Sequence, residues 1–379
     1  MKSNQYHYKN NVWQSSAALP NSSPAQLVLT FGNRKLMQDE LFREQLTVAF
    51  PNAEIIGCTT SGEILNTEIY DETLVVNELE FESTKINCQS VSLDNFENFD
   101  AAISHLVNSL PIENLKHVLV ISDGHNVNGT DLASQLMNLL PKDVTISGGL
   151  AGDGDRFQET IVWHNDQVGA KRIVLCGFYG DAIDIGYGSL GGWVPFGPQR
   201  LITKSKSNIL YELDGQSALA LYKEYLGEFA SELPASALRF PLCLKYENNE
   251  DFTVRTILNI DEETSSLIFA GDMPTGQYVT LMRANTGKLV DGAQVAAEHS
   301  LEVAEDNEPD FALLISCVGR RLVLQQESEY ELESVQEILG DFCKLSGFYS
   351  YGELSPMGVD NRCVLHNQTM TITTFKERV

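Results

Sequence analysis

The sequence predicts a mixed α/β (α+β) fold, in which repeated strand-helix-strand units form mixed sheets covered by helices, arranged in two domains. Three observations favour it. The chain of 379 residues is longer than one ordinary core accommodates. Its apolar fraction of 43% is typical of a folded globular protein. The order of strand, helix, strand and glycine-rich turn occurs three times along the chain.

The first unit follows a polar segment, residues 1–25, that we interpret as a leader. The apolar run LVLTF at 27–31 predicts a buried strand. The pattern QDELFREQLTVAF predicts an amphipathic helix, which Pro51 ends. A second strand, AEIIG, leads directly into the turn GCTTSGEI at 57–64.

The second unit has the same order. The run VLVIS at 118–122 predicts a strand, TDLASQLMNLL a helix and Pro141 its end. The strand VTISG then leads into the turn GGLAGDGD at 148–155. The same interval separates the start of the strand from the first glycine of the turn in both units, which indicates a structural repeat.

The third unit begins at ALLIS, 312–316, continues in a helix through Val335 and Phe342, and ends in GFYSYGEL at 347–354. Short β-like segments follow each turn, and short links favour antiparallel additions to a sheet. The stretch 191–200 is rich in glycine and proline. We therefore place a boundary near it, giving domains at 26–205 and 206–379.

The net charge of −26 favours solubility and repels phosphate backbones and anionic lipid headgroups, so we expect neither nucleic acid nor a membrane as a partner. No apolar run reaches the roughly 18 residues of a membrane span, and the N-terminus lacks the apolar core of a signal peptide. We expect a cytoplasmic protein. The seven cysteines show no metal-binding spacing, and we expect reduced, buried thiols.

Each of the three turns combines glycines with an acid, Glu63, Asp153 or Glu353, and the first and third turns also carry hydroxyl side chains. Glycine lets the backbone approach a ligand, and successive backbone N–H groups can bind an anion. An acid could then hold a cationic group such as an amine. The alternative is a tight turn whose acid accepts hydrogen bonds from its own backbone.

Known catalytic and nucleotide-binding motifs are either missing from the sequence or lie in a sequence context that does not match their function. The pattern GxGxxG at 186–191 is followed by Trp193 and Pro195 rather than by a helix, so it is not a dinucleotide fingerprint. Neither a phosphate-binding GxxxxGK[ST] loop nor a G-x-S-x-G nucleophile motif occurs. Cys58 and Cys317 have no neighbouring histidine in the sequence. We therefore expect that the protein is not an enzyme.

Three histidines lie in informative places. His125 is in the loop SDGHNVNG, His164 follows Trp163 at the end of a β-like run, and His366 shares its parity with apolar neighbours. A lone histidine on an apolar face is usually a satisfied core residue. A neutral imidazole in an apolar cleft, however, can bind a haem iron.

With these motifs the chain resembles the FIST family, named for F-box and intracellular signal transduction. The matching stretches cover nearly the whole chain after residue 25 in the family's order. They are GCTTSGEI, SDGHNVNGTDL and ISGGLAGDGDRF, then LDGQSALALYKEYLG, SCVGRR, GFYSYGEL and LHNQTMTITTF. The resemblance implies an N-terminal and a C-terminal FIST domain that together act as a sensory, ligand-binding module.

A bacterial-looking FIST protein of this size is similar to the nitric-oxide-sensing subgroup. That subgroup binds haem b without covalent attachment and acts on histidine kinases or cyclic-di-GMP enzymes. The resemblance does not place the axial histidine. His164 and His125 are the candidates, and the more apolar surroundings in the sequence favour His164. The other expected pocket residues are Gly148, Gly149, Asp153, Trp163, Tyr349, Tyr351 and Glu353.

Two other functions stay open. The first is a sensor of a small polar ligand such as an amino acid, with its carboxylate on the glycine turns and its amine on one of the acids. The second is an interaction scaffold without a ligand, in which the acidic surface docks a partner.

Overall fold

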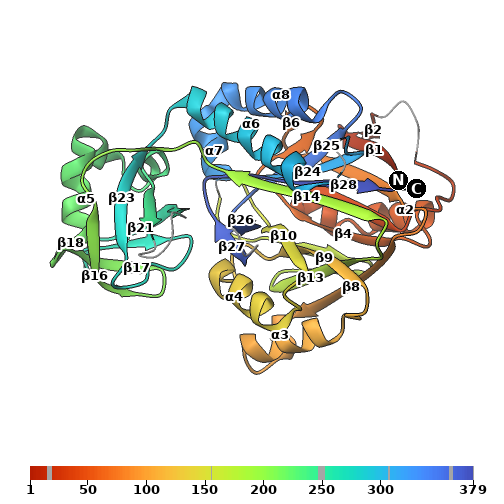
Figure 1. Cartoon of the computed structure of the whole chain (residues 1–379), viewed down its shortest axis with the longest axis horizontal. Helices are drawn as coiled ribbons and strands as arrows, with labels where there is room; N and C mark the ends of the chain where they lie inside the picture. The colour runs from red at the N-terminus through yellow and green to blue at the C-terminus, as the bar shows by residue number, and fades with distance from the viewer. Residues whose placement is uncertain (15–18, 155, 246–251, 306–307, 358–361, 379) are drawn as a thin grey trace.

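The structure, a computed structural model, describes residues 1–379 except 15–18, 155, 246–251, 306–307, 358–361 and 379. It has two parts, which we call the body and the lobe (Figure 1). The lobe is residues 194–283, and the body is the rest of the chain. The predicted mixed α/β fold, with helices on mixed sheets, is confirmed.

The body is built from three repeats of one topology. In each repeat, two parallel strands are joined through a helix, and a later strand pairs antiparallel with the first of them. The predicted strand-helix-strand units are therefore present. The three sets of strands are β3 (Leu27–Gly32), β4 (Glu54–Thr59) and β7 (Leu74–Glu80), then β9 (Leu115–Ser122), β10 (Thr145–Leu150) and β13 (Arg172–Tyr179), and finally β24 (Phe311–Cys317), β25 (Lys344–Ser350) and β28 (Met370–Glu377).

Each repeat also sends a hairpin into the sheet of another repeat. The first strand of each hairpin pairs antiparallel with the second parallel strand of its host: β5 with β25, β11 with β4, and β26 with β10. The exchange is cyclic and joins the three sheets of the body. The hairpins are β5 (Glu63–Leu65) with β6 (Glu68–Tyr70), β11 (Val162–His164) with β12 (Gln167–Gly169), and β26 (Gly352–Met357) with β27 (Arg362–His366).

One further strand extends each sheet at the side opposite the hairpin: β1 (Lys2–Lys9), β8 (Lys85–Ser92) and β14 (Ile183–Leu190). The segment predicted as a leader therefore contains β1, which pairs with β7 from Lys2 opposite Glu80 to Tyr8 opposite Leu74. A short strand β2 (Val12–Trp13) continues it. The polar composition of β1 is that of an edge strand with one exposed face.

Helices cover the outer faces of the sheets, and a shared apolar core fills the centre. The central core brings together residues of all three repeats, such as Phe31, Leu119 and Phe348. The covering helices are α1 (Arg34–Gln38), α2 (Glu40–Ala49), α3 (Phe99–Asn108), α4 (Gly129–Leu139), α6 (Thr286–Val303), α7 (Val318–Leu324) and α8 (Ser328–Leu339), with short 3₁₀ helices η1 (Leu93–Asn95) and η4 (Gln325–Glu327). Phe342, expected in the last helix, lies beyond it and is 96% exposed.

The lobe is inserted between β14 and α6, and it has its own apolar core. The predicted boundary at 205 falls inside its strand β16, and the domains 26–205 and 206–379 share the sheets of the body. Its elements are β15 (Val194–Pro195), β16 (Arg200–Lys206), β17 (Ile209–Leu213), β18 (Gln216–Ser217), α5 (Ala218–Leu226), η2 (Gly227–Glu232), η3 (Ala235–Arg239), β19 (Leu242–Lys245), β20 (Phe252–Arg255), β21 (Ile257–Asp261), β22 (Ser266–Phe269) and β23 (Tyr278–Arg283).

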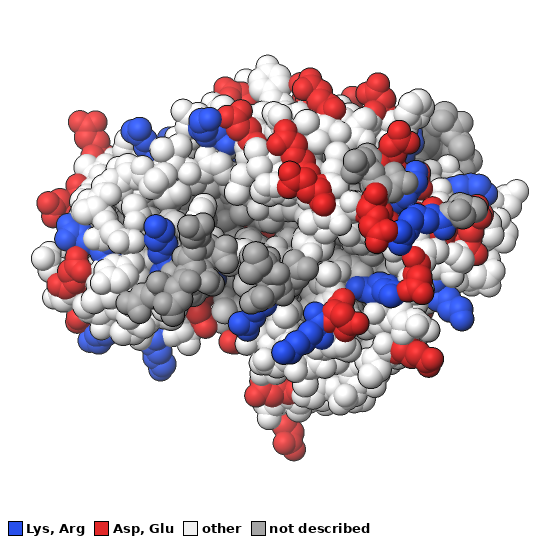
Figure 2. All heavy atoms as spheres, in the orientation of Figure 1, with Lys and Arg blue, Asp and Glu red and all other residues white. Residues whose placement is uncertain are grey.

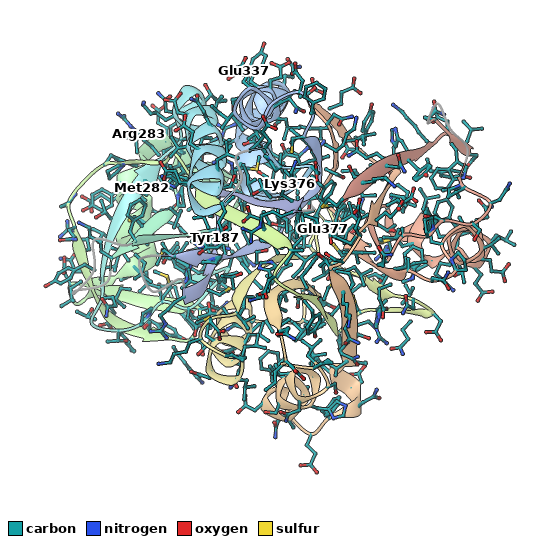
Figure 3. The ribbon with its side chains drawn as sticks, turned by 45° about the vertical axis from the view of Figure 1, so that its right-hand side comes forward. Tyr187, Met282, Arg283, Glu337, Lys376 and Glu377 are labelled. Atoms are coloured by element: carbon teal, nitrogen blue, oxygen red, sulfur yellow. The ribbon has the colours of Figure 1, made fainter. Side chains whose placement is uncertain are left out.

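The chain leaves the body after β14 and returns from β23 into α6. Figure 3 shows Tyr187 of β14 in the body, and Met282 and Arg283 at the end of β23. Acidic and basic side chains are interspersed on the face seen in Figure 2. None of the helices in the described part of the chain is both long and apolar enough to cross a membrane. All seven cysteines are free and buried.

Candidate functional site

The three glycine turns meet at the centre of the body. Backbone hydrogen bonds link each turn to the next, so that the turns form a closed ring. These bonds run from the N–H of Ser61 to the carbonyl of Tyr349 (2.8 Å), from Gly152 to Thr59 (2.9 Å) and from Tyr351 to Leu150 (3.1 Å). The three turns therefore lie together at one place in the body.

The ring is packed and encloses no hollow at these bonds. A Cβ atom added to Gly152 would lie 2.4 Å from the hydroxyl of Ser61 and 2.8 Å from its backbone nitrogen. Gly148 and Gly149 are buried within β10, where a Cβ would meet Val120 and Ile315 respectively. Glycine is therefore required here for close packing of backbone, and the ring amides are already used.

Glu353, the acid of the third turn, is fully buried and holds its own loop together. Its carboxylate accepts from the hydroxyls of Ser350 at 2.6 Å and Thr369 at 2.9 Å, and from the backbone N–H of Thr369 at 3.3 Å. Burial raises the pKa of Glu353 to about 8, although these three donors oppose the shift. The group is thus mostly protonated at neutral pH.

The acids of the other turns have similar partners. Glu63 accepts from Thr60 at 2.6 Å and from the hydroxyl of Thr73 at 2.8 Å, and burial raises its pKa to about 7. Asp153 accepts from Arg156 at 2.7 Å. This is the arrangement of a self-bonded turn. The turns do not fit the amino-acid site considered above, because among their described residues neither free amides nor free carboxylates point into a hollow.

His164 and Trp163 lie away from the ring, on β11. Trp163 is fully buried in an apolar cluster with Phe42. Both ring nitrogens of His164 have partners: Nδ1 lies 2.8 Å from the hydroxyl of Ser90 and Nε2 lies 3.1 Å from the carboxylate of Glu54. A haem ligand needs a free imidazole nitrogen beside a cavity, and His164 does not fit this role.

His125 is exposed in the loop before α4. Asp123 shapes that loop by accepting from the backbone N–H groups of His125 at 2.7 Å and Asn126 at 2.8 Å. The residues that the structure describes contain no cluster of three or more histidine, cysteine, aspartate or glutamate side chains suited to a metal ion. The open setting of His125 likewise does not fit a haem ligand.

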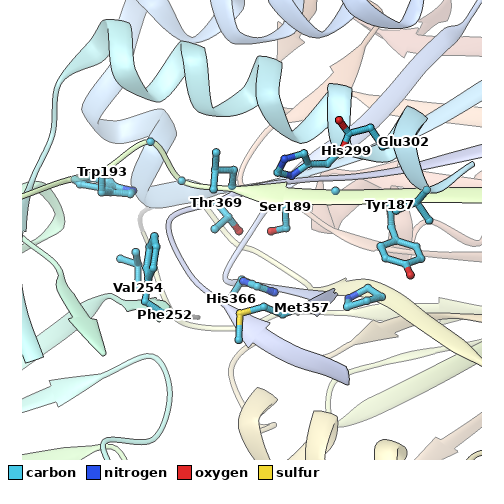
Figure 4. Close-up of a pocket in the computed structure, with 16 residues that line it drawn as sticks. Tyr187, Ser189, Trp193, Phe252, Val254, His299, Glu302, Met357, His366 and Thr369 are labelled. Carbon is cyan, nitrogen blue, oxygen red and sulfur yellow. The ribbon is translucent and has the colours of Figure 1, made fainter. Parts of the chain in front are cut away.

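A cleft of about 850 Å³ lies between the body and the lobe, within the range of small-molecule sites (Figure 4). Strands β14, β26 and β27, helix α6 and the loop after β27 supply its body side, and β20 supplies its lobe side. None of the described residues that line it is lysine or arginine. They include Tyr187, Ser189, Trp193, Phe252, Val254, His299, Glu302, Met357, His366 and Thr369.

His366 is the chemically distinct residue of this cleft. Its Nε2 lies 3.3 Å from the backbone carbonyl of Ser355, so Nε2 donates and Nδ1 carries the lone pair. Nδ1 has no hydrogen-bond partner among the described residues. Burial, assisted by the charge of Arg255, lowers the pKa of His366 to about 4, which keeps the imidazole neutral.

This neutral imidazole fits the chemistry of a haem ligand. Metal-binding histidines commonly donate their second nitrogen to a carbonyl, which fixes the tautomer that binds metal. His366 and Met357 lie on one side of the cleft, and His299 lies on the other (Figure 4). The sequence places His366 in an apolar setting but gives no signal for the cleft, because Phe252 and Trp193 come from distant segments.

The floor of the cleft is connected to the ring of turns. Thr369 lines the cleft and donates to Glu353, and the indole N–H of Trp193 donates to the carbonyl of Gln368 at 2.8 Å. A change at the cleft floor would therefore act directly on the third turn.

A buried ion pair holds the connection between the body and the lobe. Arg320 and Glu331 are fully buried, with a nitrogen-to-oxygen distance of 2.7 Å. Arg320 also donates to the carbonyls of Gly191 at 2.5 Å and Leu289 at 2.8 Å, which flank the two crossings. Glu331 accepts from the hydroxyl of Tyr349 at 2.8 Å. The expected pocket residue Tyr349 thus has a structural role.

The chain is similar to known proteins over most of its length. The model of the FIST N domain matches residues 26–216, and that of the FIST C domain matches 218–356. An uncharacterized protein of Methanocaldococcus jannaschii, MJ1623, is 24% identical over 343 residues, which are 83% of this chain and 63% of that protein. The chain thus spans less than two thirds of this relative.

A solved structure of a cyanuric acid hydrolase from A. caulinodans aligns at 11% identity, covering 78% of this chain and 99% of that one. Its TM-score is 0.19, which is too low to bear on the fold.

Proposed function

The chain belongs to the FIST family, and from this premise we propose that it is a sensor that binds a small molecule in the cleft between body and lobe. FIST domains are associated with sensing in signal transduction. The cleft carries the proposal, because its walls come from two parts of the molecule, joined by two chain crossings and by hydrogen bonds such as that from Arg255 of the lobe to the carbonyl of Leu365 at 2.9 Å. A ligand that touches both walls would favour one position of the lobe over others.

The lining narrows the class of ligand. Without a lysine or arginine among the described lining residues, and with Glu302 at its edge, the cleft favours a ligand whose enclosed part is uncharged or cationic, with any carboxylate left in solvent. Trp193 and Phe252 offer flat apolar surfaces. These features suit a planar ring compound that stacks on the aromatic side chains and binds the neutral imidazole of His366.

Haem b is the cofactor that we propose for this cleft, with His366 in place of His164 or His125 as the residue that would hold it. When bound, haem supplies an iron that takes diatomic gases such as nitric oxide. His366 would present Nδ1, while the carbonyl of Ser355 fixes the orientation of its ring. We further propose a signalling partner, such as a histidine kinase or a cyclic-di-GMP enzyme, that reads the position of the lobe.

We propose no catalytic role for the chain. Burial raises the pKa of the Cys58 and Cys317 thiols well above the ordinary range, which disfavours the nucleophilic thiolate. Both serve as buried core residues.

The test is a titration of the purified protein with haemin, followed by absorption, beside a thermal-shift screen of neutral and cationic ring compounds. We expect a Soret band that His366→Ala abolishes and that the matched variant His164→Ala retains. Equal binding by the wild type and His366→Ala would disprove the haem assignment. If neither haemin nor any compound in the screen stabilises the protein, the sensor proposal is wrong.

The response of the lobe is measured separately. Small-angle scattering with and without bound ligand should show a change in the radius of gyration. An unchanged scattering curve at saturation would disprove the proposed mode of signalling while leaving ligand binding intact.

A further inference from the structure

A second groove between body and lobe shares no lining residue with the cleft. It has a volume of about 470 Å³. The 3₁₀ helix η3 and strand β21 line it from the lobe, and helix α7 and Phe157 line it from the body. It is therefore a separate candidate site.

The walls of this groove are apolar and partly open to solvent. Leu258 of β21 is 42% exposed and Leu322 of α7 is 36% exposed. Both belong to the small number of large apolar side chains that the described surface leaves in water. Covering them would be favourable, at about 25 cal/mol for each Å² of apolar surface removed from water.

Arg239 is the only charged residue among the described residues that line the groove. Its guanidinium forms neither a hydrogen bond nor an ion pair with any residue that the structure describes. In contrast, Arg320 and Arg321 on α7 are paired with Glu331 and Asp71. The exposed Arg239 thus places an unpaired cation next to an apolar surface. It supplies the charge that an organic anion would need.

Phe157 forms a fixed part of the body wall. Its φ of 50° lies in the left-handed region, which bulky side chains seldom adopt. Its ring stacks on Tyr351 with a centroid distance of 4.6 Å, and its backbone N–H donates to the hydroxyl of Tyr351 at 3.2 Å. The expected pocket residue Tyr351 thus supports this groove, and local strain of this kind is concentrated at ligand-binding positions.

We infer that this groove binds an organic monoanion with an apolar body, such as a medium-chain carboxylate or an aryl sulfonate. The apolar body would cover Leu258 and Leu322, and the anionic group would lie on the guanidinium of Arg239. The inference does not depend on the sensor role of the cleft, because the two sites have separate linings.

The experiment uses the full chain and two probes: the fluorescence of anilinonaphthalene sulfonate, and its displacement by decanoate. Decan-1-ol, which has the same tail without the charge, separates the anionic from the apolar contribution. Arg239→Gln tests the cation, and Arg283→Gln, an exposed arginine outside the groove, is the matched control. Leu322→Asp places a like charge in the apolar wall. Circular dichroism and melting temperature show that each variant is folded.

We expect saturable displacement by decanoate in the wild type and in Arg283→Gln. Arg239→Gln should weaken the decanoate affinity about tenfold, as for loss of a charge-assisted hydrogen bond, and should leave decan-1-ol unaffected. Leu322→Asp should abolish the binding of both decanoate and decan-1-ol. The inference is overturned if the wild type does not bind decanoate, or if folded Arg239→Gln binds it as well as Arg283→Gln does. Haemin titration of the same variants should be unchanged.

Discussion

Replacing Glu353 by glutamine should make the stability of the protein less dependent on pH. Glutamine keeps the shape of the protonated carboxyl: its oxygen can accept from Thr369, and its amide N–H can face the hydroxyl of Ser350, which donates to the carboxylate in the wild type. In the wild type, burial raises the pKa of Glu353 from 4.5 to about 8 in the folded state. Its contribution to stability is therefore fully present below pH 4.5 and is lost as the pH rises through about 8.

The magnitude follows from the range in which only the folded state holds the proton. Within the range from pH 5 to 9 there are roughly three pH units in which Glu353 is protonated in the folded protein and ionised in the unfolded chain. At 1.36 kcal/mol for each unit, the wild type loses about 4 kcal/mol from this group. The glutamine variant has no such loss, so its stability relative to the wild type should rise by this amount.

The assay is urea unfolding followed by tryptophan fluorescence at pH 5, 7 and 9. Glu224→Gln, on the exposed side of α5, controls for the loss of a carboxylate as such. Taking the difference between variant and wild type removes the contributions of all other titrating groups. A difference between wild type and Glu353→Gln that stays constant from pH 5 to 9 would refute the argument that burial outweighs the three donors.

Three further predictions concern the packed centre. Gly152→Ala should lower the melting temperature by several degrees because its Cβ has no room, whereas Gly169→Ala, which meets nothing within 4 Å, should not. Glu331→Gln should lower the free energy of unfolding by about 3 kcal/mol, since it leaves Arg320 buried without a counter-charge; an effect under 1 kcal/mol in urea unfolding would contradict this. Burial lowers the pKa of His117 to about 3, so stability falls as the pH drops from 6.5, and His117→Gln should reduce that slope in melts from pH 7 to 4.

The local part of the fold could be predicted from the sequence. The buried runs at 27–31 and 118–122 are strands, as predicted, because a continuous apolar run this short and rich in β-branched residues is typical of a buried strand rather than of a helix. The hairpin exchange could not be predicted, since β5 and its partner β25 are far apart in the chain and their register depends on tertiary contacts. For the same reason the sequence does not show that the lobe, residues 194–283, is an insertion into the body.

The candidate site was harder to predict than the fold. The turns were found because glycines and an acid recur at the same place in each unit, but the sequence does not show that a hydroxyl and the acid of one turn bond to each other, as Ser350 and Glu353 do. Trp163 marked an apolar setting around His164, and that setting is a core rather than a cleft. The carbonyl of Ser355 binds Nε2 of His366 and so leaves Nδ1 free, and this contact cannot be predicted from sequence spacing.

The cyclic exchange of hairpins bears on how the polypeptide becomes a native protein. Strand β10, made in the first half of the chain, lacks its neighbour until β26 has been synthesised, and the hairpin β5–β6 waits for β25. Unpaired strand edges of this kind can pair with strands of other chains and promote aggregation. We therefore expect the two FIST segments to complete their sheets together, after the last repeat has been synthesised.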